Sequence, residues 1–149
     1  MFAATRAGVM ARKANGPSAR YFRFLCNATN GGASLVLNEL QLRGTVGGGN
    51  LLSPSSVMAT NGDGTVSNLV DGSLSTIWGN SSASGIWARA DLGVTTSVAE
   101  LALYYGTSNL LFSPKDFRIQ TSPDATAWTD ALVLTGITWT ANTWKYFLL

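Results

Sequence analysis

Short apolar segments alternate with clusters of Gly, Ser and Asn along most of the chain, and this alternation predicts a series of β-strands. Within residues 117–121, Phe117, Ile119 and Thr121 share one face of a strand, and the residues between them face the other way. The predicted strands cover residues 21–26, 35–43, 87–92, 98–105, 117–121, a region that begins at 128 and includes 132–134, and 144–149. No segment has the period of an amphipathic helix, so the pattern predicts an all-β jelly-roll sandwich of about eight antiparallel strands.

Two local patterns sharpen this prediction. Residues 35–43 form one continuous predicted strand, in which Asn38 and Leu40 face away from Glu39. Residues 93–96, with the sequence Gly-Val-Thr-Thr, predict a turn between the strands at 87–92 and 98–105.

The composition fits one domain with a short leader. Residues 1–19 are rich in Ala, Gly and basic side chains and end at a Gly-Pro-Ser sequence, so we expect a flexible basic arm there and a β-sandwich over residues 20–149. Charged residues make up 12% of the chain, about half the usual value. The surface must therefore draw its polarity from Ser, Thr, Asn and Gly, which suits an extracellular or virion protein.

Basic charge is concentrated at the start of the chain. The net charge is +2, from ten Lys and Arg and eight Asp and Glu. Four of the ten basic residues precede residue 21: Arg6, Arg12, Lys13 and Arg20. The rest of the chain carries the other six basic residues and all eight acidic residues. The basic segment before residue 21 either anchors the domain to an acidic surface or is a solvated leader. No basic stripe with interleaved aromatics supports nucleic-acid recognition.

Several classes of chemistry are excluded by residue type. The chain has no histidine and one cysteine, Cys26, so it has neither a Ser–His or Cys–His pair nor an intrachain disulfide. Residues 62–64, Gly-Asp-Gly, lack the lysine of a phosphate-binding loop. Asp116, Asp124 and Asp130 are typical turn acids, although two of them would serve as a glycosidase pair. We therefore predict a non-catalytic protein, without a signal peptide or a membrane span.

The segment at residues 68–78 concentrates oxygen-bearing side chains in a sharp turn. Asp71 is followed by glycine, and the hydroxyls of Ser73 and Thr76 follow within five residues. These groups can bind a hard cation such as Ca²⁺, which takes six to eight oxygen ligands. They can equally form an Asx turn that satisfies only the backbone of the loop. The sequence leaves both interpretations open.

Six segments in this order resemble the discoidin, or coagulation factor 5/8 type C, domain of the galactose-binding-like superfamily. They are residues 38–42, 71–78, 87–93, 113–120, 121–128 and 144–148. The resemblance covers about residues 20–149 and implies the same β-sandwich.

The order of two strands departs from the usual family pattern. In many members an aromatic-Arg-hydrophobic strand and a Glu-bearing strand close the domain, whereas here residues 21–24 and 37–40 open it. This arrangement resembles a variant common in structural proteins of bacteriophages. The permutation is physically easy if the terminal strands lie side by side.

The resemblance also implies a metal site. Many relatives hold a structural Ca²⁺ under the Asp-Gly loop, with a second carboxylate from the Glu strand. By position the carboxylates are Asp71 and Glu39, and Asn68, Ser73 and Thr76 would lend carbonyl or hydroxyl oxygens. Without an ion, Glu39 would be an outward-facing strand residue or a partner of a loop amide.

Relatives bind sugars, lipid head groups or proteins through loops at one rim. The residues expected at such a rim here are Asn80, Arg89, Tyr105, Asn109 and Phe112. Tyr105 and Phe112 suit a core position equally well. Trp78, Trp87 and Trp128 match core positions of the family pattern, so we expect them to be packed inside.

These observations favour a structural protein of a phage virion. The basic arm would anchor the domain to capsid or tail subunits and give it an oligomeric setting in the particle. The alternative is a carbohydrate-binding adhesin that recognises bacterial surface glycans through its rim.

Overall fold

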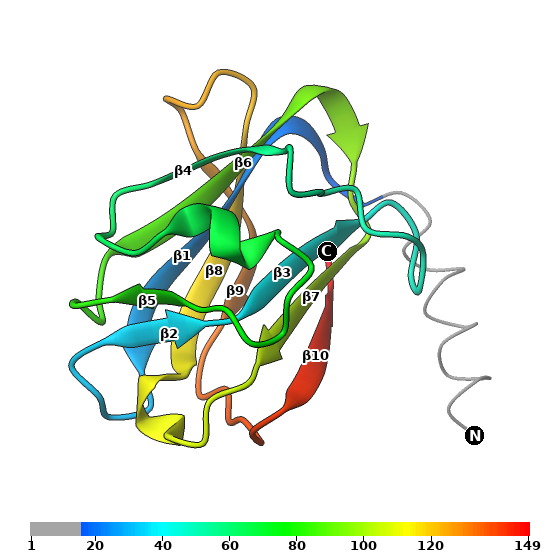
Figure 1. The fold of residues 1–149 in the computed structure, drawn as a ribbon. Coiled ribbons are helices and arrows are strands. Elements are labelled where there is room, and N and C mark those ends of the chain that lie inside the picture. Colours follow the sequence, from blue (N-terminus) through cyan, green and yellow to red (C-terminus); the bar gives the residue numbers. More distant parts are fainter. Residues whose placement is uncertain (1–15) are drawn as a thin grey trace.

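The computed structural model describes residues 16–149 and contains ten strands in three antiparallel sheets (Figure 1). The strands are β1 (Ser18–Thr29), β2 (Leu35–Leu37), β3 (Glu39–Arg43), β4 (Val57–Thr60), β5 (Trp78–Asn80), β6 (Ile86–Ser97), β7 (Glu100–Tyr105), β8 (Pro114–Ser122), β9 (Thr129–Leu134) and β10 (Thr143–Leu148). The only helices among the described residues are two short 3-10 turns, η1 (Val66–Leu69) and η2 (Leu110–Phe112). The predicted all-β sandwich is confirmed.

The strands form a five-stranded sheet, a three-stranded sheet and a two-stranded pair. The strand orders are β4-β6-β1-β8-β9, β10-β7-β3 and β2-β5. β1 lies at the centre of the larger sheet, as Figure 1 shows, and Phe22, Phe24 and Cys26 point to the core. The odd-numbered side chains between residues 21 and 25 therefore line the outer face of that sheet.

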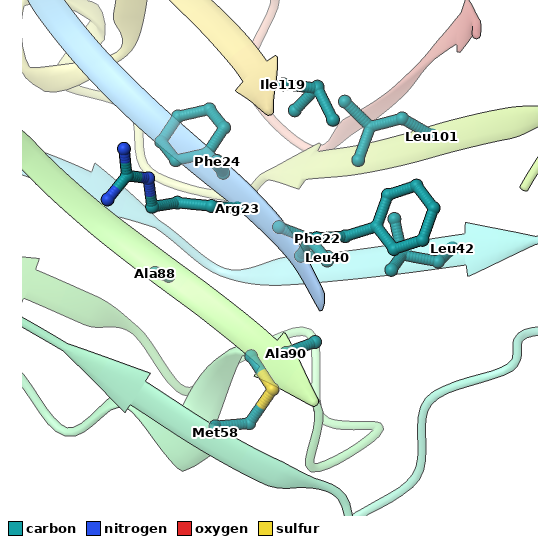
Figure 2. A pocket seen from close by; sticks show the side chains of 10 residues that line it. All are labelled: Phe22, Arg23, Phe24, Leu40, Leu42, Met58, Ala88, Ala90, Leu101 and Ile119. Atoms are coloured by element: carbon teal, nitrogen blue, oxygen red, sulfur yellow. The ribbon is translucent and has the colours of Figure 1, made fainter. Parts of the chain in front are cut away.

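The core fills the space between the two larger sheets. Phe22 and Phe24 of β1 face Leu40 and Leu42 of β3, and Leu101 of β7 completes the contact (Figure 2). The void that remains among these apolar side chains has room for no more than about one water molecule. A larger ligand does not fit in this void.

The predicted strand over residues 35–43 is interrupted at Asn38. β2 pairs with β5 and β3 pairs with β7, so the chain changes sheets at this residue. Asn38 and Glu39 are both buried. Of the two alternatives for Glu39 without an ion, the outward orientation is wrong, and the partner of a loop amide is the one found, since Gly72 N donates to Glu39 Oε1 at 2.9 Å. The loop after η1 covers Glu39, and a strand-period pattern contains no information about that loop.

The predicted turn at residues 93–96 is part of a strand. β6 continues to Ser97, because the start of β1 pairs with this segment after a register shift between Ala19 and Tyr21. Gly93 accommodates the change with a φ of 79°, a conformation that other residues rarely adopt.

Both ends of the described chain meet at the connection between β6 and β7. The carbonyl of Pro17 accepts a hydrogen bond from Val98 N at 3.0 Å, and Leu149 N donates to the carbonyl of Ala99 at 3.0 Å. β1 and β10 themselves lie in different sheets, so the terminal strands do not lie side by side, which was the condition stated for an easy permutation. The ends are nevertheless close enough for a permuted strand order to preserve the sandwich.

The sandwich begins earlier in the chain than the sequence suggests. β1 begins at Ser18, and Arg20 forms a bidentate ion pair with Asp91 of β6 at 2.7 and 2.9 Å. Arg20 therefore belongs to the sandwich. The other predicted anchoring residues, Arg6, Arg12 and Lys13, lie outside the described residues.

Candidate functional site

Glu39 and Asp71 form a pair of facing carboxyl groups beneath the loop at residues 71–76. Glu39 begins β3 with only 2% of its surface exposed, and its Oε1 accepts a hydrogen bond from Gly72 N at 2.9 Å. Asp71 accepts from Ser73 N at 2.8 Å and from Thr76 Oγ1 at 2.7 Å. The two carboxyl groups lie close enough for each to shift the pKa of the other.

Their surroundings give the two carboxyl groups different affinities for a proton. Burial, followed by the contact with Asp71, raises the pKa of Glu39 to about 7. Partial burial opposes ionisation of Asp71, but the hydrogen bonds from Thr76 and Ser73 outweigh it and lower the pKa of Asp71. A shared proton relieves the repulsion in the pair, and a bound cation would relieve it in the same way.

The oxygen atoms gathered beneath this loop are suitable ligands for a hard cation. Besides the two carboxylates, Thr76 Oγ1 lies 3.3 Å from the Ser73 carbonyl oxygen, so four of the five predicted ligands are together. All supply oxygen, as Ca²⁺ requires. Asn68 instead donates its Nδ2 to the Ile77 carbonyl at 2.9 Å and closes the loop. No cluster of three or more His, Cys, Asp or Glu occurs within residues 16–149, so backbone carbonyls or water would complete the ligand set.

The predicted binding rim is not assembled in the structure. Tyr105 is completely buried and packs against Trp139 at a ring distance of 5.8 Å, while Asn80 is only 4% exposed. Neither side chain is available to a ligand at a rim, because both are buried. The sequence pattern did not identify which face of their strands points inward. Asn109 and Phe112 lie together at η2, where Asn109 Oδ1 accepts from Leu111 N at 3.2 Å.

Arg89, the fifth predicted rim residue, belongs to a different surface. It lies on the outer face of the five-stranded sheet with Trp87 and Trp128, both of them half-buried. Trp78 is in the core as expected, but Trp87 and Trp128 are not. The alternation along β1 was the sequence signal that could have revealed this surface, since it places Arg23 on the outer face of the sheet. Its neighbours depend on the pairing of β1 with β6 and β8, which local sequence does not specify.

Comparison with known proteins identifies one family. A family model described as an F5/8 type C, NedA-like galactose-binding domain matches residues 68–146, more than half of the chain. The match includes Asp71 and β6 to β9. No curated protein and no solved structure matches the chain. Within residues 16–149 no helix is long and apolar enough to cross a membrane.

Proposed function

The chain belongs to the NedA-like, galactose-binding family of F5/8 type C domains, and from this premise we propose that it is a non-catalytic carbohydrate-binding module. The observation that carries the proposal is the half-exposed position of Trp87 and Trp128 on one sheet face. Large aromatic rings left at a surface supply flat apolar area for the apolar face of a sugar ring.

A glycan array probed with the purified protein tests this function. We expect binding to a defined set of saccharides, and a loss of about tenfold or more in affinity on Trp128→Ala, because a stacked Trp is a typical hot spot. The control is Tyr146→Ala, which removes a 47% exposed aromatic ring on the other sheet and should change affinity less than about twofold. Absence of binding to every saccharide on the array would refute the function.

As a structural addition to this module, we propose one Ca²⁺ held by Glu39 and Asp71, with Ser73 and Thr76 as further oxygen donors. The support is the contact between two carboxylates beneath a loop rich in oxygen atoms. The ion would neutralise the pair and fasten the loop to β3.

Calcium is therefore expected to raise the melting temperature relative to EDTA by about 5–10 °C. This range follows from about 2.7 kcal/mol at a hundredfold excess over Kd and about 2–4 °C per kcal/mol. Glu39→Gln should abolish the calcium response, because one charged ligand is lost. Asp63→Asn, which changes an exposed acid in another loop, should retain it. Equal melting temperatures of the wild type in calcium and EDTA would exclude a stabilising site.

We also propose that this module is displayed on a phage particle, with the segment before β1 contacting capsid or tail subunits. The opening position of β1 and β3, which resembles the phage variant of the family, supports this setting. Deletion of residues 1–15 leaves β1 intact and should abolish incorporation into particles without changing the melting temperature. Normal incorporation of the truncated chain, measured by mass spectrometry of purified particles, would overturn the anchoring role.

A further inference from the structure

The outer face of the five-stranded sheet carries arginine side chains layered with aromatic rings. The guanidinium carbon of Arg23 lies 4.0 Å from the ring centre of Trp128 and 5.6 Å from that of Trp87. The guanidinium carbon of Arg89 lies 5.8 Å from the Trp87 ring and 5.6 Å from the Tyr21 ring. We name this surface the arginine–aromatic face and define it as Tyr21, Arg23, Trp87, Arg89, Gln120 and Trp128.

Two positive charges lie directly opposite each other on this face. Arg23 and Arg89 are paired across β1 and β6, an arrangement of like charges that destabilises a sheet. Burial, followed by the charge of Arg89, lowers the pKa of Arg23. The aromatic rings offset part of this repulsion through cation–π contacts.

The neighbouring carboxylates do not neutralise this pair. Asp91 is bound by Arg20 at 2.7 Å, and Asp130 is bound by Arg118 at 2.9 Å. The charge of Asp130 acts on Arg23 and offsets part of the lowering of its pKa, but no carboxylate of residues 16–149 forms an ion pair with Arg23 or Arg89. The arginine–aromatic face therefore carries two positive charges without an ion-pair partner from the described residues.

One of the two guanidinium groups is held in a fixed orientation. Gln120 Oε1 accepts from both Arg23 Nε at 2.9 Å and Arg23 Nη2 at 2.6 Å, and Gln120 Nε2 donates to Asp130 Oδ1 at 2.8 Å. Arg23 Nη1 and the guanidinium of Arg89 donate no hydrogen bond to the part of the chain that the structure describes. Figure 2 shows the Arg23 side chain apart from the apolar residues of the core. These donors are available to a ligand at the surface.

We propose that the arginine–aromatic face binds an acidic saccharide, one whose sugar rings carry carboxylates. Arginine donors match a carboxylate geometrically, and the exposed area of Trp87 and Trp128 suits the apolar face of the same ring. This assignment rests on the proposed carbohydrate-binding function and specifies its site and ligand class. A second copy of the chain is a poor occupant, since pairing two such faces would bring four uncompensated positive charges together.

The test compares matched ligands that differ only in charge. Binding is measured by isothermal titration calorimetry for a panel of uronate-containing hexasaccharides and for the same hexasaccharides with each carboxylate reduced to an alcohol. A decamer of deoxythymidine serves as a nucleic-acid probe. The protein variants are the wild type, Arg89→Gln and the control Lys115→Gln, which removes the same charge from an exposed side chain of β8.

We expect the wild type to bind at least one uronate hexasaccharide about tenfold or more tightly than its reduced counterpart. Arg89→Gln should abolish this preference, and Lys115→Gln should retain it with an unchanged melting temperature. Equal affinity for the charged and reduced ligands would overturn the acidic class while leaving carbohydrate binding intact. A preference that survives Arg89→Gln would overturn the location. Tighter binding of the decamer, lost in Arg89→Gln, would assign the face to single-stranded nucleic acid instead. Failure of every hexasaccharide in this panel would refute this inference, and the proposed function would be refuted with it only if the glycan array were also negative.

Discussion

Replacing Asn38 by alanine is expected to lower the free energy of unfolding by about 3–4 kcal/mol, because it removes three hydrogen bonds made by one buried side chain and leaves their backbone partners unpaired. Asn38 is 3% exposed, and its Nδ2 donates to the carbonyls of Leu74 and Thr76 at 3.1 Å each. Its Oδ1 accepts from Gly106 N at 2.7 Å. One side chain thus joins the β2–β3 break, the loop at residues 71–76 and the end of β7.

Urea unfolding of the purified domain measures this loss. Asn38→Asp is a sharper variant of similar size, because a carboxylate keeps the contact with Gly106 but cannot donate to the two carbonyls. It should therefore destabilise at least as strongly as alanine. Asn27→Ala, at an exposed position of β1, is the control and should change the free energy of unfolding by less than about 0.5 kcal/mol. A loss below about 1 kcal/mol in Asn38→Ala would show that water or a shifted loop replaces these hydrogen bonds.

Phe24→Ala is expected to cost about 3–5 kcal/mol, through lost burial and an unfilled cavity. Phe24 is 2% exposed and lies between Trp78 and Phe117, with ring centres 6.3 and 5.2 Å away. It also lines the small core void, so truncation enlarges a space that the two sheets already leave open (Figure 2). Because these sheets hold each other apart, the cavity cannot close fully.

The melting temperature should fall by about 10 °C in Phe24→Ala, measured by circular dichroism. Phe24→Leu retains most of the volume and should lose about 1–1.5 kcal/mol. Val133→Ala removes methyl groups from a residue that is 53% exposed on β9, and it should stay within about 0.5 kcal/mol of the wild type. Similar losses in Phe24→Ala and Phe24→Leu would mean that the cavity contributes little.

The loop that holds the proposed calcium site is held in place both by hydrogen bonds from residues at the start of β3 and by hydrogen bonds within the loop. Asn38 and Glu39, consecutive in sequence, bind the carbonyls of Leu74 and Thr76 and the amide of Gly72. The internal Asx turn at Asp71, with Ser73 N as donor, is also present. The two interpretations of the loop are therefore compatible, because the turn orients the same carboxylate that a cation would use.

Much of the fold was predictable because its information is local. The alternation of Phe117 and Ile119 with polar residues identified β8, and the pattern around Arg23 identified β1. The interruption at Asn38 was not predictable, since its cause is a set of hydrogen bonds to segments more than thirty residues away. The short strands β4 and β5 have too few residues to show a period.

The sequence by itself determined the all-β class and the turn chemistry at Asp71, because strand periodicity and turn signals depend on residues close together in the chain. The family and the pairing of Asp71 with Glu39 came from the resemblance of six ordered segments. Only the tertiary structure decided which aromatics face solvent and which arginines lack an ion-pair partner. Strand order and register bring Arg23 beside Arg89, Trp87 and Trp128 from distant parts of the chain. The other strand pairs, β7 with β3 and β10 and β5 with β2, hold Tyr105 and Asn80 in buried positions. Sequence analysis had placed Asn80 at a binding rim and had left Tyr105 open between rim and core. Which side chains lie next to one another on the face of a sheet depends on strand pairing and register, and these involve segments far apart in the chain.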